Sequence, residues 1–121
     1  MKDKTTQILA LKQIFAHYGT RNQISKLHEE QGELIDALYD MHLFMQVYEV
    51  LLQQYIPQQV EDNKARYTDH VAEEIADNLV LMRQFMQAYG ISQEQVEQIA
   101  EAKINRQIGR IEKELSEPKP F

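Results

Sequence analysis

The sequence contains no cysteine, only four glycines and three prolines in 121 residues, and no long apolar run. Without cysteine, the chain can form neither disulfide bonds nor thiolate metal sites. The scarcity of glycine and proline, with no strand-like alternation of apolar residues, indicates helices. Because no window approaches about 18 apolar residues and the N-terminus lacks the apolar run of a signal peptide, we expect a cytoplasmic protein that does not associate with membranes.

The chain also lacks an excess of basic residues. It has 13 lysines and arginines against 19 aspartates and glutamates, which gives a formal net charge of −6. Proteins that bind DNA or RNA rely on an excess of positive charge, so we do not expect a nucleic acid polymer as the partner. A small phosphorylated ligand remains compatible with this charge, since a bound Mg²⁺ would supply the positive charge.

The length and composition are those of one globular domain. The chain has 121 residues, of which 43% are hydrophobic, and this is ordinary for a small soluble domain. We expect one all-α domain over residues 1–115, followed by a flexible tail at 116–121 that is extended or disordered. Because a core of this size is small, we also expect help from a partner subunit.

Apolar spacing predicts four helices arranged as a four-helix bundle with a long second helix. The first covers residues 5–18 and ends at Gly19, a residue type that favours the conformation after a helix. Thr20 and Gln23 fit a capping box at the start of the second helix. This second helix follows a seam that alternates spacings of three and four, which is typical of bundle packing: Ile24, Leu27, Gln31, Leu34, Leu38, Met41, Met45, Tyr48, Leu52 and Tyr55.

The second half of the chain predicts the other two helices. Pro57 and the polar run 58–64 interrupt the pattern, so we expect the only long connection at 56–65. A third helix over 66–89 carries a main apolar stripe and a second row with Leu81 and Phe85. Gly90 fits the position just after the third helix, and Ser92 and Gln95 predict a cap at the start of the fourth helix. The main stripe of the third helix consists of Val71, Ile75, Leu79, Met82, Met86 and Tyr89.

Two pairs of acids stand out against this pattern, Glu30 with Glu33 and Glu74 with Asp77. Residues i and i+3 of a helix lie on one face, about 5–6 Å apart at Cβ. Glu30 lies one position off the seam, and apolar residues follow Glu74 and Asp77, so we expect the acids to point into the bundle. Four converging carboxylates would be costly without a cation, and Mg²⁺ prefers oxygen ligands.

Other chemistry is less well supported by the residues. A single pair of acids at this spacing most often lies on a solvated face, so the prediction depends on the two pairs meeting. The four histidines are scattered, and none follows a glutamate at the spacing that di-iron bundles use. No glycine-rich phosphate loop and no nucleophilic serine or cysteine arrangement is present. Lys103, Arg106 and Arg110 fit either phosphate binding or ion pairing near a helix C-terminus.

The two acidic motifs resemble a known signature. Glu29-Glu30-Gln31-Gly32-Glu33-Leu34, followed by Glu73-Glu74-Ile75-Ala76-Asp77, is similar to the motifs of the all-α nucleoside triphosphate pyrophosphohydrolases. This superfamily includes MazG, dimeric dUTPases and phosphoribosyl-ATP pyrophosphohydrolase. Lys103-Ile104-Asn105-Arg106 is similar to the basic cluster on the family's last helix. The resemblance covers about residues 20–110, although forty residues separate Glu33 from Glu74, more than in compact MazG-like members.

The resemblance implies a MazG-type protomer, a reaction and a set of site residues. Glu30, Glu33, Glu74 and Asp77 would bind Mg²⁺, or Mn²⁺ in its place, and act in catalysis. The protein would hydrolyse a (d)NTP or a related nucleotide to the monophosphate and pyrophosphate, a reaction compatible with a house-cleaning role. It would work as a homodimer or homotetramer. The residues implied in phosphate or substrate binding are Lys103, Asn105, Arg106, Gln23 and Lys26.

A second class of function fits the same residues. A long helical hairpin with apolar faces could serve as a catalytically silent dimer that acts as a regulatory or partner-binding module. The two hypotheses differ in their response to Mg²⁺, because only the metal-dependent enzyme is expected to be stabilised by it.

Overall fold

The computed structural model describes residues 3–118, and these residues form four helices and no strand. The order is α1 (Lys4–Tyr18), α2 (Thr20–Gln54), α3 (Pro57–Ala88) and α4 (Gln93–Ser116). The predicted all-α chain of four helices with a long second helix is confirmed. None of the helices in this part of the chain combines the length and the apolar character needed to cross a bilayer.

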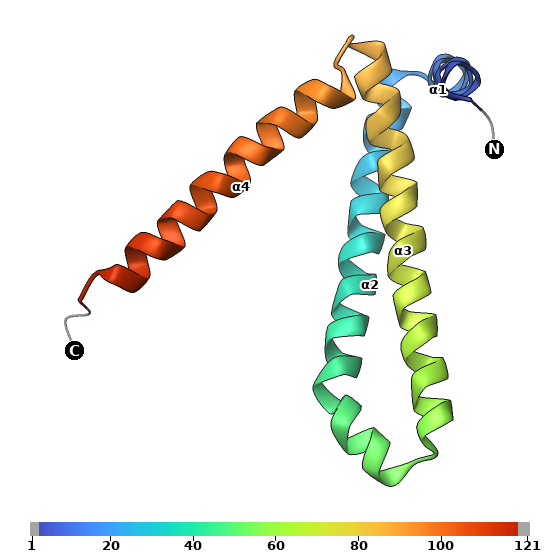
Figure 1. The fold of residues 1–121 in the computed structure, drawn as a ribbon. Coiled ribbons are helices and arrows are strands. Elements are labelled where there is room, and N and C mark those ends of the chain that lie inside the picture. The colour runs from blue at the N-terminus through green and yellow to red at the C-terminus, as the bar shows by residue number, and fades with distance from the viewer. Residues whose placement is uncertain (1–2, 119–121) are drawn as a thin grey trace.

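The centre of the fold is an antiparallel hairpin of α2 and α3 (Figure 1). α2 has 35 residues, which at 1.5 Å per residue makes it about 52 Å long. α1 lies across the end of the hairpin where α2 begins and α3 ends, and it packs mainly on α3. One contact there is edge-to-face, with the ring centroids of Phe15 and Phe85 5.4 Å apart.

The helix boundaries follow from local chemistry. Asp3 caps α1 by accepting a hydrogen bond from the Thr6 amide at 2.8 Å. Ser92 caps α4 in the same way with the Gln95 amide at 3.0 Å. Gly19 and Gly90 have positive φ values of 87° and 66°, a conformation that glycine adopts without steric cost. The helix ends predicted at these two glycines and the cap at Ser92 are therefore confirmed.

Two boundary predictions were wrong. Thr20 is the first residue of α2 rather than its cap, and no side chain caps this helix. The long connection predicted at 56–65 is absent, because α3 begins at Pro57. Proline is well suited to the first helical position, where its missing amide hydrogen costs nothing. The polar run that follows is compatible with a helix, and Val60 anchors it to α2 by burial.

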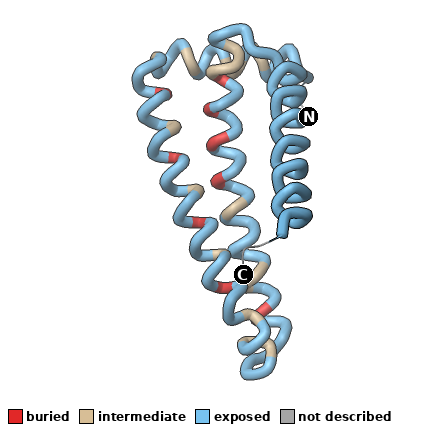
Figure 2. Tube along the Cα trace, turned by 90° about the vertical axis from the view of Figure 1, so that its left-hand side faces the viewer, coloured by how far each residue is buried: buried red, intermediate tan, exposed pale blue. Residues whose placement is uncertain are grey.

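The packing seam between α2 and α3 is a heptad pattern. Figure 2 displays the burial, and the buried residues belong to these two helices alone among the described ones. On α2 they recur every seven residues, and half-buried residues lie between them, as in coiled-coil packing. The buried residues of α2 are Gln23, Glu30, Ala37 and Phe44, and those of α3 are Val60, Glu74, Asn78, Leu81 and Gln84.

This seam corrects the predicted one. Glu30 was expected one position off the seam, but it lies in it, whereas Ile24 and Leu38 are exposed. On α3, Leu81 of the predicted second row is buried, while Ile75 and Leu79 of the predicted main stripe are exposed. Both helices are apolar on more than one side, so a single partner helix covers only one of these sides. The described residues of one chain leave the other side uncovered.

α4 differs from the other three helices. It extends away from the hairpin (Figure 1) and makes no more than marginal contact with α1, α2 or α3. All of its residues are exposed. α4 includes Ser116, the first residue of the predicted tail, so the helix runs one residue further than expected. Residues 117–118 follow the helix, and 119–121 of the predicted tail lie outside the described residues.

Candidate metal centre

Three carboxylates meet on the hairpin, Glu30 and Glu33 from α2 and Glu74 from α3. One carboxylate oxygen of each lies within 4.8 Å of one from each of the others. The heptad positions of Glu30 and Glu74 direct both side chains between the helices, and Glu33 reaches the same place from the adjacent turn. The predicted convergence of acids from the two motifs is therefore present for three of the four residues.

The buried carboxylates lack enough partners. Glu30 and Glu74 are only 6% and 9% exposed. One oxygen of each, Oε2 in both cases, is buried without a hydrogen-bond partner. A buried carboxylate oxygen without a partner is destabilising. These two orphaned oxygens fit a hard divalent cation, which binds oxygen ligands of this kind.

Lys26 places a positive charge beside these acids. Its Nζ lies 3.0 Å from Glu30 Oε1 and 3.8 Å from Glu29 Oε1. The hydrogen bond to Glu30, followed by the charge of Glu29, raises the pKa of the Lys26 ammonium above its usual value. Lys26 therefore satisfies one oxygen of Glu30 and leaves the other oxygen available.

The mutual repulsion of the acids is visible at Glu33. A hydrogen bond shared with Glu30, together with the negative charge of Glu30, raises the pKa of the Glu33 carboxyl above its usual value. Desolvation and the charge of Glu74 act in the same direction, although Glu33 is exposed. A cation between the three carboxylates would remove this repulsion.

Asn78 holds the two helices together beside the acids. Its Nδ2 donates hydrogen bonds to the backbone oxygens of Glu30, at 3.0 Å, and of Glu74, at 2.8 Å. Asn78 was not predicted as a site residue, because Asp77 was taken as the second acid of the motif. The helical spacing could have indicated it, since Asn78 lies four residues after Glu74 and continues the heptad seam.

Asp77 lies at the rim instead of in the centre. It is exposed and is not one of the three converging acids, but it lines a hollow next to them. The hollow has a volume of about 580 Å³ and is open to solvent on one side. Its lining comes from the end of α1 and from both hairpin helices: Tyr18, Asn22, Gln23, Lys26, Glu30, Asp77, Val80, Leu81 and Gln84.

The inner wall of the hollow carries a pair of amides. Gln23 Nε2 donates a hydrogen bond to Gln84 Oε1 at 2.7 Å, and the two side chains are 6% and 2% exposed. Gln23 was predicted as a substrate-binding residue, and it lines the hollow. Gln84 was not predicted. The hollow thus combines polar amides with the apolar side chains of Val80 and Leu81.

The remaining predicted site residues lie elsewhere. Lys103, Asn105 and Arg106 are on α4, are exposed and do not line the hollow. Residues two apart on a helix are turned by about 200°, so Asn105 faces away from Lys103. Within one chain, the acids, Gln23 and Lys26 are brought together, and the basic residues of α4 are not.

Comparisons with known proteins add no identification. No family model, no curated protein and no solved structure matches the chain. The residues of the hairpin and their geometry are therefore the basis for inferring what the protein does.

Proposed function

We propose that this chain is a Mg²⁺-dependent nucleoside triphosphate pyrophosphohydrolase, which converts a (d)NTP or a related nucleotide to the monophosphate and pyrophosphate. The observation that carries the proposal is the meeting of Glu30, Glu33 and Glu74, with two buried carboxylate oxygens that lack a partner. The resemblance of the two acidic motifs to the all-α pyrophosphohydrolases supports the choice of reaction.

In this proposal the carboxylates hold the metal. Glu30, Glu33 and Glu74 bind Mg²⁺, or Mn²⁺ in its place, and Asp77 completes the acidic set from the rim. When bound, the ion supplies Lewis-acid polarisation of phosphate oxygens and a water of lowered pKa. Lys26 keeps Glu30 oriented through their ion pair and adds a positive charge beside the phosphates.

The hollow next to the acids suits the nucleoside. Its volume of about 580 Å³ falls in the range of small-molecule sites, which are mostly apolar with a few placed polar groups. Val80 and Leu81 offer apolar contact to a base, and the Gln23–Gln84 pair offers amide groups to its edge. Binding of the sugar and base here places the phosphate chain toward Glu30 and Asp77.

Assembly is part of the proposal. Exposed apolar residues are numerous on both hairpin helices, including Ile24, Ile35 and Leu38 on α2 and Ile75, Leu79 and Met82 on α3. Contiguous exposed apolar surface of this kind marks an interaction site. We infer a homodimer or homotetramer in which these rows are covered.

The deciding experiment is pyrophosphate release with Mg²⁺ from a panel of canonical and modified NTPs and dNTPs. Wild type is assayed beside Glu74→Gln, which keeps the shape of the side chain and removes its charge. We expect release that Glu74→Gln lowers by more than about 100-fold, because removing a ligand costs at least as much as disturbing the groups that support one. Undiminished release by Glu74→Gln would refute the assigned site.

A second candidate is a silent helical module that binds a partner protein. The exposed α4 and the uncovered apolar rows of the hairpin favour it. This candidate predicts no turnover of any nucleotide and no effect of Mg²⁺ on the melting temperature. Stabilisation by Mg²⁺ that Glu74→Gln removes would exclude it.

A further inference from the structure

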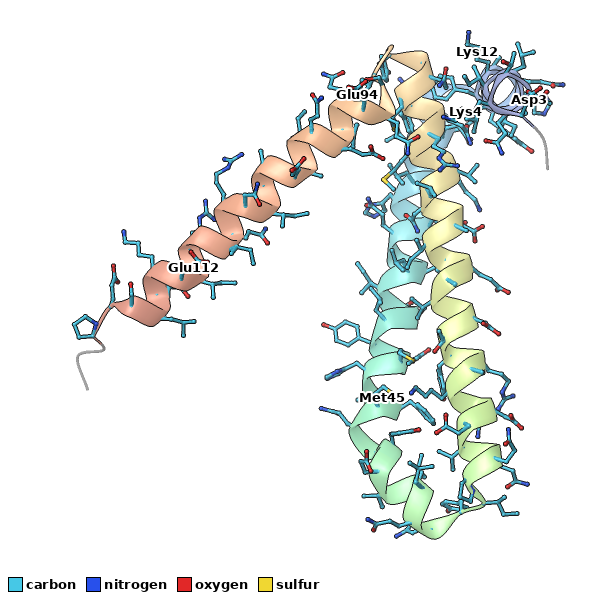
Figure 3. The ribbon with its side chains drawn as sticks, in the orientation of Figure 1. Asp3, Lys4, Lys12, Met45, Glu94 and Glu112 are labelled. Carbon is cyan, nitrogen blue, oxygen red and sulfur yellow. The ribbon has the colours of Figure 1, made fainter. Side chains whose placement is uncertain are left out.

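A second hollow lies on the hairpin, nearer to the turn than the hollow beside Glu30, which is called the first hollow from here on. The second hollow has a volume of about 290 Å³, and its lining residues are Asp40 from α2 and Arg66, Tyr67 and His70 from α3. In Figure 3 the labelled Met45, five residues after Asp40, marks this part of α2. All four lining residues belong to the long stretch that separates the two acidic motifs, and the proposed function gives them no role.

The second hollow lies on the same side of the hairpin as the acids. Residues seven apart along a heptad seam return to the same side of the helix, and two such rows connect the hollows. The row on α2 is Lys26, Glu33 and Asp40, and the row on α3 is Gln84, Asp77 and His70. In each row the first residue lines the first hollow, the second belongs to an acidic pair, and the third lines the second hollow.

The spacing places the metal centre between the two hollows. At 1.5 Å per residue, Asp40 lies about 10 Å along α2 from Glu33, and His70 lies about 6 Å along α3 from Glu74. A ligand that extends from the first hollow across the acids therefore reaches the second hollow within two helical turns.

The chemistry of the second hollow suits an anion. In the described part of the chain no acid pairs with Arg66, and its Nη2 donates a hydrogen bond to Asn63 Oδ1. A guanidinium has five N–H donors, so most of them remain for a ligand, and His70 on the next turn offers another. The ring of Tyr67 is stacked on Phe44 with centroids 4.9 Å apart, which holds this wall of the hollow in place. Phosphate oxygens accept paired hydrogen bonds from the planar fork of an arginine.

We propose that Arg66 and His70 bind the β- and γ-phosphates of the substrate, the pair that leaves as pyrophosphate, while the nucleoside occupies the first hollow. The identity of the substrate rests on the proposed function, whereas the anion site does not. The contents of the two hollows support this direction, because the first offers the apolar side chains of Val80 and Leu81 and the second offers the guanidinium.

Asp40 makes the assignment testable by the sign of an effect. It faces the same hollow from α2, and its carboxylate repels a phosphate. Asp40→Asn should therefore strengthen the binding of an anion several-fold. A cation site would respond in the opposite way, so weaker pyrophosphate binding by Asp40→Asn would overturn the proposal.

The main test is calorimetric titration of the full-length protein with inorganic pyrophosphate in the presence of Mg²⁺. We expect Arg66→Gln to weaken binding about tenfold, because charge-assisted hydrogen bonds are lost. Arg66→Lys should have an intermediate affinity, since lysine keeps the charge without the fork. Arg83→Gln is the control, because Arg83 is an exposed arginine of the same helix that lines neither hollow. Equal affinities of Arg66→Gln and Arg83→Gln, or no binding by wild type, would overturn the proposal.

His70 has a matched control of its own. His70→Gln should weaken pyrophosphate binding by a smaller factor than Arg66→Gln, since one donor is removed. His42→Gln should leave the affinity unchanged, because His42 is exposed on α2 and lines neither hollow. Arg66, His70 and both control residues are exposed, so the melting temperatures of these variants should match that of wild type. A loss of affinity in His42→Gln as large as in His70→Gln would contradict the assigned site.

A kinetic arm tests the direction of the substrate. Arg66→Gln should raise KM for the triphosphate about tenfold and leave inhibition by the nucleoside monophosphate unchanged, because the monophosphate lacks the two phosphates concerned. Weaker inhibition by the monophosphate with unchanged pyrophosphate binding would place the nucleoside in the second hollow and overturn the proposal. Pyrophosphate binding that depends on Arg66, without turnover of any nucleotide by wild type, would refute the proposed reaction alone. Turnover by wild type with pyrophosphate binding indifferent to Arg66 would refute the anion site alone.

Discussion

The two halves of the α2–α3 hairpin use the same heptad seam for different purposes. Toward α1 the buried positions are mostly polar, with Gln23, Glu30 and Glu74 among them. Toward the turn at Tyr55–Ile56 they are Ala37, Phe44 and Val60. Apolar burial is the main source of stability, while buried carboxylates without partners oppose it. The half toward the turn, here the far half, therefore holds the hairpin together. The half toward α1, here the near half, is destabilised by the buried polar groups of the candidate site.

The aromatic contacts of the far half support this division. The rings of Phe44 and Tyr67 stack with centroids 4.9 Å apart, and Tyr48 lies beside Phe44 at 6.1 Å. Lys64 Nζ lies 4.9 Å from the centroid of the Tyr48 ring. Such contacts add to the free energy gained by burying the rings themselves.

The largest expected effect comes from removing the central ring of the far half. Phe44→Ala should lower the free energy of unfolding by about 3–5 kcal/mol, since it deletes a buried phenyl group and leaves a cavity. Chemical denaturation measures the change. Leu43→Ala, at the neighbouring exposed position, is the control and should have a small effect. A loss below about 1 kcal/mol for Phe44→Ala would mean that the far half does not carry the stability of the hairpin.

Replacing an acid of the near half should change the free energy of unfolding in the opposite direction. Glu74→Met should raise the free energy of unfolding of the metal-free protein by about 1–3 kcal/mol, because an orphaned buried carboxylate oxygen is removed. The same change should abolish stabilisation by Mg²⁺. Thermal melts with Mg²⁺ and with a chelator measure both effects. If Glu74→Met were less stable than wild type under chelation, the charge of Glu74 would be a structural requirement of the fold.

Asn78 is the polar residue of the near half whose amide nitrogen joins the two helices, and we expect its two hydrogen bonds to outweigh its Oδ1, which is buried without a partner. Asn78→Leu should lower the free energy of unfolding by about 1–2 kcal/mol through loss of the hydrogen bonds to the Glu30 and Glu74 carbonyls. Denaturation of this variant beside Asn78→Asp, which keeps the size but has no amide hydrogen to donate, tests the cause. Both variants should lose stability. Full stability of Asn78→Asp would show that these hydrogen bonds are not responsible.

The smallest effect is expected at the surface of the far half. Tyr48 donates a hydrogen bond to Glu61, and this bond raises the pKa of the Tyr48 phenol above its usual value. The unfolded chain therefore loses the phenolic proton at a lower pH than the folded chain, so stability is present below the usual tyrosine pKa and is lost as pH rises through the folded value. Tyr48→Phe should flatten this loss at alkaline pH and leave stability at neutral pH nearly unchanged. Melting temperatures from pH 8 upward measure it; a steeper alkaline loss in Tyr48→Phe would contradict the assignment.

The sequence predicted the class of fold and the meeting of the acids, because both depend on local spacing. Ser92, Gly19 and Gly90 act within a few residues, and their roles were predicted correctly. The partner face of each long helix was not predicted. Ile24 and Glu30 lie on different sides of α2, and hydrophobicity alone favours burying Ile24, whereas α3 covers the side with Glu30. Which apolar side a hairpin buries depends on the second helix and on subunit contacts, and periodicity in one helix contains no information on either.

Helical spacing predicted which acids meet, but not how deeply each one is buried. Spacing of three places Glu33 and Asp77 about 60° from the seam, so both lie nearer the surface than Glu30 and Glu74. The turn at Tyr55–Ile56 shows why forty residues separate the two motifs: α2 and α3 both continue well past the acids before the chain reverses.

The buried amides have one more consequence, which concerns the sliding of the helices. A heptad seam repeats every seven residues, so α2 and α3 could shift along each other by two turns and still bury a regular row. Asn78 and the Gln23–Gln84 pair oppose that shift. After a slip of seven residues, Asn78 would face Gln23 or Ala37 in place of the Glu30 carbonyl, and Gln84 would lose Gln23. Polar residues that weaken the near half thus select one alignment of the hairpin, and that alignment is the one in which Glu30, Glu33 and Glu74 meet.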